Sequence, residues 1–317
     1  MGLGHELKIL FLAAEAAPFA KVGGLGEVAG TLPLYLRSLS TDSFLEKPNH
    51  KKDNLRRIDI RLVIPFHRAI HVEEHEVKYL TEFELLGPEG SLKAEVFLTT
   101  IDGLPVYLIS GLPISESEQI YSQDTTEDGF KYTFFSLASL KMVKEINWIP
   151  DIIHANDWHT SPAIYALSLN QKSEGFFQDT ITLLGVHNLP DLGVAASSAL
   201  RAFGLPPATG SDLPTWAQDV PLPLGMLTAD HIVTVSPTYA REILTPDFGA
   251  GLHTFLQGRR ESISGILNGI DIDRWNPEDD EFITSNYQQK NLNNKLGNKT
   301  DLLDEFGLPA DNRRPLL

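Results

Sequence analysis

Four clusters of side chains that could bind or react follow predicted strands, and the first is the glycine-rich segment 21–27, KVGGLGE. Adjacent glycines let the backbone approach a ligand closely, and a helix N-terminus offers unpaired N–H groups to phosphate. Lys21 adds a positive charge, so Lys21, Gly23 and Gly24 form a candidate phosphate-binding loop. The segment is neither a dinucleotide fingerprint nor a Walker loop. A glycine turn that only lets a helix pack on a strand would explain the same residues.

The second cluster, residues 154–160, reads HANDWHT and combines two histidines, a carboxylate and an indole at a predicted strand end. A sugar site uses aromatic faces for stacking and polar side chains for hydrogen bonds to hydroxyls, so Asp157 and His159 are candidates for it. A metal site from both histidines and Asp157 is conceivable, but the spacing matches no zinc motif. Alternatively, Asn156 or Asp157 caps the next helix while Trp158 fills the core.

The third cluster is His187-Asn188, at the end of the predicted strand 180–186. A lone histidine is more often structural than catalytic, but the carboxyl edge of a parallel sheet is where ligands bind. The fourth cluster, residues 236–242, reads SPTYARE. A serine N-cap followed by proline in the first helical position explains its start as a helix signal.

The elements that must position these clusters alternate between apolar runs of strand length and amphipathic stretches. This alternation predicts an α/β fold, a Rossmann-like mostly parallel sheet with helices on both faces. Its parallel strands should bring Gly23, Asp157 and His187 to one edge. Strands are predicted at 8–14, 58–65, 151–155, 180–186, 229–235 and 263–267, an antiparallel excursion at 75–86, 92–99 and 104–110, and helices at 26–39, 130–146, 160–169, 237–244 and 302–308.

The composition narrows the possible partners. The chain has 317 residues, 42% of them hydrophobic, and no apolar run near the roughly 20 residues that cross a bilayer. With 26 basic and 42 acidic residues its formal charge is −16, which argues against nucleic acid or an anionic membrane as partner. It has no cysteine, which excludes disulfides and thiolate chemistry and fits a cytoplasmic protein. A polar insertion is expected at 41–57.

No single cluster fixes the function, but their order is informative. The motifs K-x-G-G-L, H-x-x-D-W-H, V-H-N-L, S-P-T-Y-A-R-E and I-L-N-G-I-D-x-x-x-W-N-P follow one another along the chain. Together they resemble the bacterial glycogen synthase and plant starch synthase family from residue 8 to about 277. The resemblance implies that residues 1–277 form the N-terminal half of a GT-B fold. In this fold, two Rossmann-like domains face each other across a cleft.

By this resemblance, Lys21 and the two glycines beside it contact the donor diphosphate, and Asp157 lies on the acceptor side of the cleft. His187 would lie next to the transferred glucose, with Asn188 as its neighbour. The implied enzyme transfers glucose from ADP-glucose to the non-reducing end of an α-1,4-glucan, retains the anomeric configuration and releases ADP. Neither a cofactor nor a metal is expected.

Three segments depart from the family's motifs. Residues 190–193 read PDLG where the family has AYQG, residues 222–224 read LPL where it has FLK, and residues 127–132 read EDGFKY where it has DNxxRF. Residues 278–317 are polar and are expected to be a connector toward a second Rossmann-like domain. That domain would have to join in cis or in trans, and the chain alone is expected to be inactive.

Two functions therefore remain open. One is the glucosyltransferase half just described. The other is a non-catalytic, synthase-like protein that binds glucan or another synthase during polymer initiation.

Overall fold

The computed structural model describes residues 5–39, 55–70, 75–88, 90–170, 175–270, 272, 275–311 and 313–316. Most of the predicted polar insertion, 41–54, lies outside them. The chain divides into two compact units, Met1–Leu267 and Asn268–Leu317, whereas the sequence placed a boundary after residue 277. Among the described helices, none is long and apolar enough to cross a membrane.

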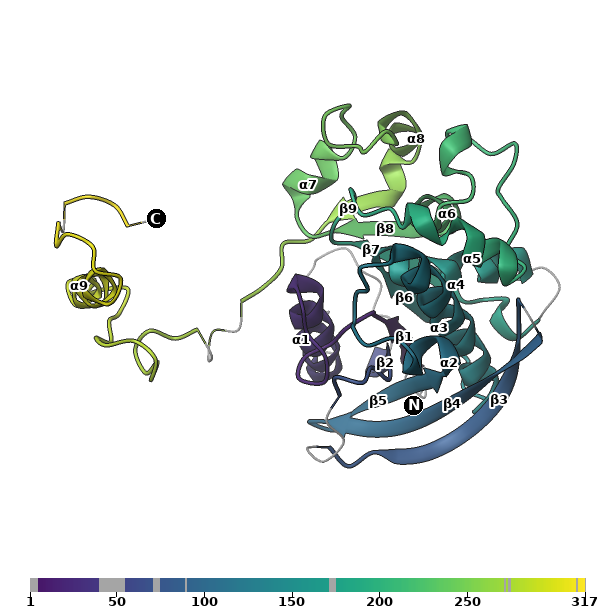
Figure 1. Cartoon of the computed structure of the whole chain (residues 1–317), viewed down its shortest axis with the longest axis horizontal. Helices are drawn as coiled ribbons and strands as arrows, with labels where there is room; N and C mark the ends of the chain where they lie inside the picture. The colour runs from purple at the N-terminus through teal and green to yellow at the C-terminus, as the bar shows by residue number, and fades with distance from the viewer. Residues whose placement is uncertain are drawn as a thin grey trace. The chain divides into compact units, whose positions relative to one another are not determined.

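Within the described residues, nine strands form one sheet in the order β3-β4-β5-β2-β1-β6-β7-β8-β9 (Figure 1). All neighbours from β5 to β9 pair in parallel, and only β3-β4 and β4-β5 are antiparallel. The predicted mostly parallel sheet with an antiparallel excursion is thus confirmed. The strands are β1 (His5–Leu12), β2 (Leu55–Pro65), β3 (Lys78–Gly87), β4 (Gly90–Ile101), β5 (Leu104–Gly111), β6 (Ile152–Asn156), β7 (Ile181–Val186), β8 (His231–Thr234) and β9 (Ile263–Gly265).

Helices cover both faces of the sheet (Figure 1). Side chains alternate along β1, so Ile9 and Phe11 join the core under α1, while Leu10 and Leu12 join the core under α3, α4 and α6. The helices are α1 (Gly24–Ser38), α2 (Leu112–Ser115), α3 (Thr125–Glu145), α4 (Asp157–Asn170), α5 (Ser197–Ala202), α6 (Pro221–Thr228), α7 (Pro237–Glu242), α8 (His253–Gly258) and, in the second unit, α9 (Lys295–Glu305).

Some helix boundaries differ from the predictions for local reasons. Helix α3 begins at Thr125, five residues earlier than predicted, because the side chain of Asp124 accepts a hydrogen bond from the Thr126 N–H (2.8 Å) and caps it. Helix α9 begins at Lys295 rather than 302. Helix α6, PLPLGMLT, was not predicted; its residues are apolar on every side and therefore show no helical period.

The register of the central strands aligns their carboxyl ends. Leu12 of β1 pairs with Ala155 of β6, Ala155 pairs with Leu184 of β7, and Val186 of β7 pairs with Thr234 of β8. The loops after β1, β6, β7 and β8 therefore leave from one edge of the sheet. The four clusters follow these four adjacent strands in the same order as in the sequence.

Candidate active site

The glycine-rich loop after β1 folds around a buried carboxylate. Glu15, 1% exposed, accepts hydrogen bonds from the N–H groups of Val22 and Gly23, the latter at 3.2 Å. A Cβ at Gly26 would lie 3.0 Å from Glu15 Oε2, so the carboxylate leaves little room beside that glycine. Helix α1 begins at Gly24, and no side chain caps its N-terminus. The loop is therefore shaped by a side chain that precedes it.

Lys21 lies at the surface of this loop. Its Nζ forms an ion pair with Glu27 in the first turn of α1, and the two side chains are 40% and 38% exposed. A diphosphate at this loop would have to compete with Glu27 for the lysine. An exposed pair of this kind is worth little in water, so the competition is weak.

Asp157 joins the start of α4, directly after β6, to the loop after β7. It is the first residue of α4, has a φ of +54° and is 7% exposed. Its Oδ1 accepts hydrogen bonds from the N–H groups of His187 (2.7 Å) and Asn188 (3.3 Å). Burial raises the pKa of Asp157 to about 7, although these two bonds favour its ionised form. The structure thus brings Asp157, His187 and Asn188 together.

Asn156 connects His187 to the end of β1. Its Nδ2 donates to the Leu12 carbonyl (2.9 Å), which leaves Oδ1 as the acceptor 3.0 Å from His187 Nε2. The His187 Nε2 therefore carries the hydrogen, as assigned from this network. Burial lowers the pKa of His187 to about 4, so the ring is neutral near neutral pH. A Cβ at Gly185 would approach the same Oδ1 to 2.5 Å, which explains the glycine.

His159 lies in the aromatic core rather than at a surface that a sugar could cover. The side chain is 5% exposed, and its ring contacts Trp158 (4.2 Å between centroids), Tyr132 (4.6 Å) and Tyr121 (5.0 Å). Burial lowers the pKa of His159 to about 3. Trp158 is 4% exposed and fills the core, as the structural alternative for this cluster expected.

The fourth cluster is hydrogen-bonded to the loop that carries the third cluster. The side chain of Ser236 accepts a hydrogen bond from the Tyr239 N–H (2.9 Å), and Pro237 opens α7, which confirms the predicted helix start. The Tyr239 hydroxyl in turn accepts a hydrogen bond from the Leu189 N–H (2.9 Å). This bond ties the loop after β7 to α7.

Two residues at this edge were not predicted from the sequence. Glu15 is the single acidic residue within the otherwise apolar run 9–20, and that isolation was an available signal. Tyr121 is half-buried, and its ring contacts those of Tyr132 and His159. Burial together with the nearby carboxylate of Glu15 raises the pKa of Tyr121. Nothing in the local sequence marks Tyr121.

Two residues within the segments that depart from the family's motifs, Gly193 and Lys131, have clear structural roles. Gly193 has a φ of +75°, and a Cβ there would approach the Trp158 ring to 2.6 Å. Lys131, fully buried, forms an ion pair with Asp128 (2.6 Å) and donates to the carbonyls of Gln119 and Ile120. This bonding holds the segment that carries Tyr121.

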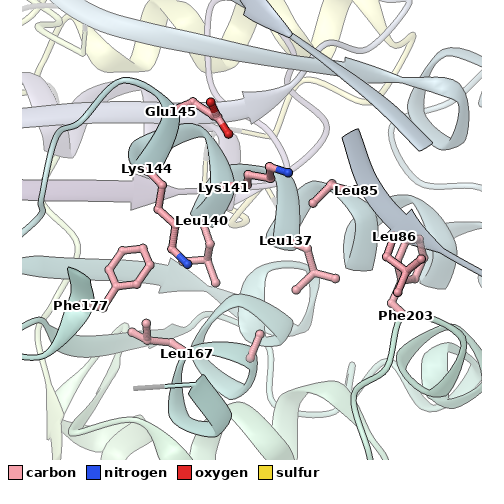
Figure 2. Close-up of a pocket in the computed structure, with 11 residues that line it drawn as sticks. Leu85, Leu86, Leu137, Leu140, Lys141, Lys144, Glu145, Leu167, Phe177 and Phe203 are labelled. Carbon is pink, nitrogen blue, oxygen red and sulfur yellow. The ribbon is translucent and has the colours of Figure 1, made fainter. Parts of the chain in front are cut away.

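A groove of about 400 Å³ lies elsewhere in the first unit (Figure 2). Leu167 follows Asp157 by ten residues, about 15 Å along α4. Phe177 precedes the first residue of β7. The groove therefore lies toward the amino ends of the strands, away from the candidate site. It is lined by Leu85, Leu86, Leu137, Leu140, Lys141, Lys144, Glu145, Ala166, Leu167, Phe177 and Phe203.

Among the described residues, the side chains at this edge form no evident metal-binding site. Within the part of the chain that the structure describes, no group of three or more histidine, aspartate or glutamate side chains is arranged to hold a metal ion. His154 packs edge-on against Phe11 (4.5 Å between ring centroids), and burial lowers its pKa to about 3.

Comparison with known proteins agrees with the fold and the motifs. The family model of the starch synthase catalytic domain matches residues 8–258. Glycogen synthase 2 of Geobacter sulfurreducens is 33% identical and glycogen synthase of Thermosipho africanus 35%, each over 98% of this chain and 62% of the relative. The catalytic domain of starch synthase IV from Arabidopsis thaliana, solved with ADP and acarbose, superposes with a TM-score of 0.75 at 28% identity, over 98% of this chain and 62% of that one.

The chain thus spans about 62% of the length of these relatives. The similarity to the starch synthase IV domain confirms the predicted α/β fold as the N-terminal part of a GT-B glycosyltransferase. Because the family model covers most of the chain and its motifs follow adjacent strands, this chain belongs to the glycogen and starch synthase family.

Proposed function

We propose that the chain forms the donor-diphosphate and acceptor side of a glucosyltransferase that transfers glucose from ADP-glucose to an α-1,4-glucan with retention. The observation that carries the proposal is the convergence of the four clusters at one sheet edge, with Asp157 bonded to the backbone of both His187 and Asn188. The relative solved with ADP supports an ADP-bearing donor.

The donor side of this site must compensate the charge of a diphosphate locally, because the whole chain carries a formal charge of −16. Lys21 supplies a cation, and the uncapped N-terminus of α1 supplies backbone N–H groups. In an oxocarbenium-like transition state the departing ADP gains negative charge, and these groups would stabilise it.

The sugar-binding part of the site would work through hydrogen bonds. His187, neutral and fixed through Nε2 by Asn156, would offer an imidazole beside the transferred glucose, and Asp157 would lie on the acceptor side. Asp157 holds the backbone of His187 and Asn188, which orients that imidazole. Holding donor and acceptor in the reactive geometry lowers the barrier of the transfer step, because their translational and rotational entropy has already been lost on binding.

A second Rossmann-like domain, in cis or in trans, would complete the cleft. We therefore expect no appreciable transfer by the 317-residue chain alone, and transfer when it is combined with the C-terminal part of a related synthase. Robust ADP release from ADP-glucose and glycogen by the chain alone would contradict this.

The donor side is tested by Lys21→Ala, measured as ADP binding to the chain and as transfer in the completed enzyme. We expect a loss of about 1–3 kcal/mol, the range for a charge-assisted hydrogen bond. Lys78→Ala is the matched control, since Lys78 is a 70% exposed lysine of β3 paired with Glu76. Unchanged kinetics together with an unfolded domain would show that the loop is only structural.

A non-catalytic role remains the second candidate because of helix α6. Where the family has a lysine, this chain has Leu222, Pro223 and Leu224, all buried. Glycogen binding by the completed protein, without turnover of ADP-glucose, would favour this role.

A further inference from the structure

Glu15 is placed where a negative charge should be unfavourable. It lies beneath the loop that carries Lys21, which under the proposed function receives an anionic diphosphate. With 1% exposure it can contact little of a bound ligand directly. Its oxygens instead accept hydrogen bonds from the N–H groups of Val22 and Gly23.

These bonds fix the part of the chain that leads into helix α1. The Val22 and Gly23 amides directly precede Gly24, the first residue of the helix. Gly26, two residues further, packs so closely that a Cβ would lie 3.0 Å from Glu15 Oε2 and 3.0 Å from Lys21 Cγ. The position of Lys21 and the direction of the helix N-terminus therefore both depend on Glu15.

We propose that Glu15 is a positioning residue that holds the Lys21 loop and the N-terminus of α1 in the geometry that binds the donor diphosphate. The inference rests on the proposed function. Glu15 acts through the backbone of Val22 and Gly23.

Glu27 provides a matched control, because Glu27→Gln is expected to change the affinity for ADP in the opposite direction from Glu15→Gln. It is also acidic and also near Lys21, but it is 38% exposed and pairs with the lysine ammonium. Removing either negative charge reduces electrostatic repulsion of a diphosphate, so charge alone predicts tighter binding for both Glu15→Gln and Glu27→Gln. Positioning predicts weaker binding for Glu15→Gln only, because glutamine is uncharged and has one acceptor oxygen, whereas the Val22 and Gly23 amides contact both carboxylate oxygens.

The experiment is ADP titration calorimetry on the full 317-residue chain and its two variants. We expect Glu15→Gln to raise the ADP Kd by about tenfold, the loss of one charge-assisted hydrogen bond, and Glu27→Gln to lower it by about two- to fivefold. Amide hydrogen exchange is measured in parallel. Exchange at Val22 and Gly23 should be at least about tenfold faster in Glu15→Gln and unchanged at Leu10 in the core of β1.

The outcomes separate the two proposals. ADP binding that tightens in Glu15→Gln, or unchanged exchange at Val22 and Gly23, would overturn the positioning role. If neither the wild-type chain nor the enzyme completed with the C-terminal part of a related synthase binds ADP, the proposed donor side is wrong, while the exchange rates still decide whether Glu15 holds the loop. Should Glu15→Gln fail to fold, Glu15→Asp keeps the charge with a shorter reach. Faster exchange at the same two amides and a raised Kd would then support the role, and wild-type values would refute it.

Discussion

Replacing Asp157 with asparagine should change how the stability of the protein depends on pH. The pKa of Asp157 is raised from 3.8 to about 7, with burial as the largest cause. Asparagine keeps an oxygen that can accept from the His187 and Asn188 amides, and it tolerates the φ of +54°. The substitution therefore removes the titration and retains the geometry.

The sign follows from proton binding. Between pH 3.8 and about 7 the folded state keeps the proton on Asp157 and the unfolded state has lost it. The contribution of Asp157 to stability is therefore fully present below pH 3.8 and is lost as pH rises through about 7. A shift of about three pKa units corresponds to about 4 kcal/mol, a large part of a typical free energy of unfolding.

The assay is denaturant unfolding of wild type and Asp157→Asn at pH values from 4.5 to 8.5, followed by far-UV circular dichroism. Both proteins share the buried histidines, whose lowered pKa values give the opposite pH dependence, so the difference between the two proteins isolates Asp157. The free energy of unfolding of Asp157→Asn, relative to that of wild type, should increase by up to about 4 kcal/mol between pH 4.5 and pH 8.5. A difference that is flat or falls with pH would refute the reasoning, because the two amide bonds would then outweigh burial.

Two further substitutions test how the diverged segments are held. Gly193→Ala should lower the free energy of unfolding by about 2–4 kcal/mol, because φ is +75° and the new Cβ meets the Trp158 ring, whereas Gly204→Ala, with φ +78° and open space, should cost only about 1 kcal/mol. Equal losses would show that Trp158 moves aside. Lys131→Met should cost about 3–5 kcal/mol in thermal or denaturant unfolding, since it leaves Asp128 buried without its cation. Asp128→Asn in the same chain should recover part of that loss, and no recovery would contradict a direct pairing.

The sheet was predictable because buried parallel strands are continuous apolar runs bounded by polar residues. Each of the six strands predicted as parallel has its ends within three residues of the structure. The start of α4 was misplaced because Asp157, in left-handed geometry, already belongs to the helix, and such a residue is not a usual helix start. Helix α6 was missed because it has no polar face.

The site was less predictable, because its contacts join residues far apart in the chain. Motif order placed Asp157 and His187 at neighbouring strand ends, but the bond between them connects two loops 30 residues apart. Asn156 looked like a helix cap, and only the pairing of β1 with β6 shows that it reaches Leu12. His159 was predicted to face a sugar, while the rings around it place it in the core.

The charges at this edge divide between its two sides. The loop after β1 carries Glu15 and Lys21, and Lys21 forms an ion pair with Glu27 in the first turn of α1. After β6 and β7, His187 is neutral at pH 7, and burial raises the pKa of Asp157 to about 7 and also raises the pKa of Asp191. Under the proposed function, the Lys21 ammonium would face the anionic donor, and the hydrogen-bonding groups of the second side would face the uncharged glucan. The side chain of Asn156 joins these two sides, because it is hydrogen-bonded both to Leu12 of β1 and to His187. We therefore expect a substitution on one side to affect the other side.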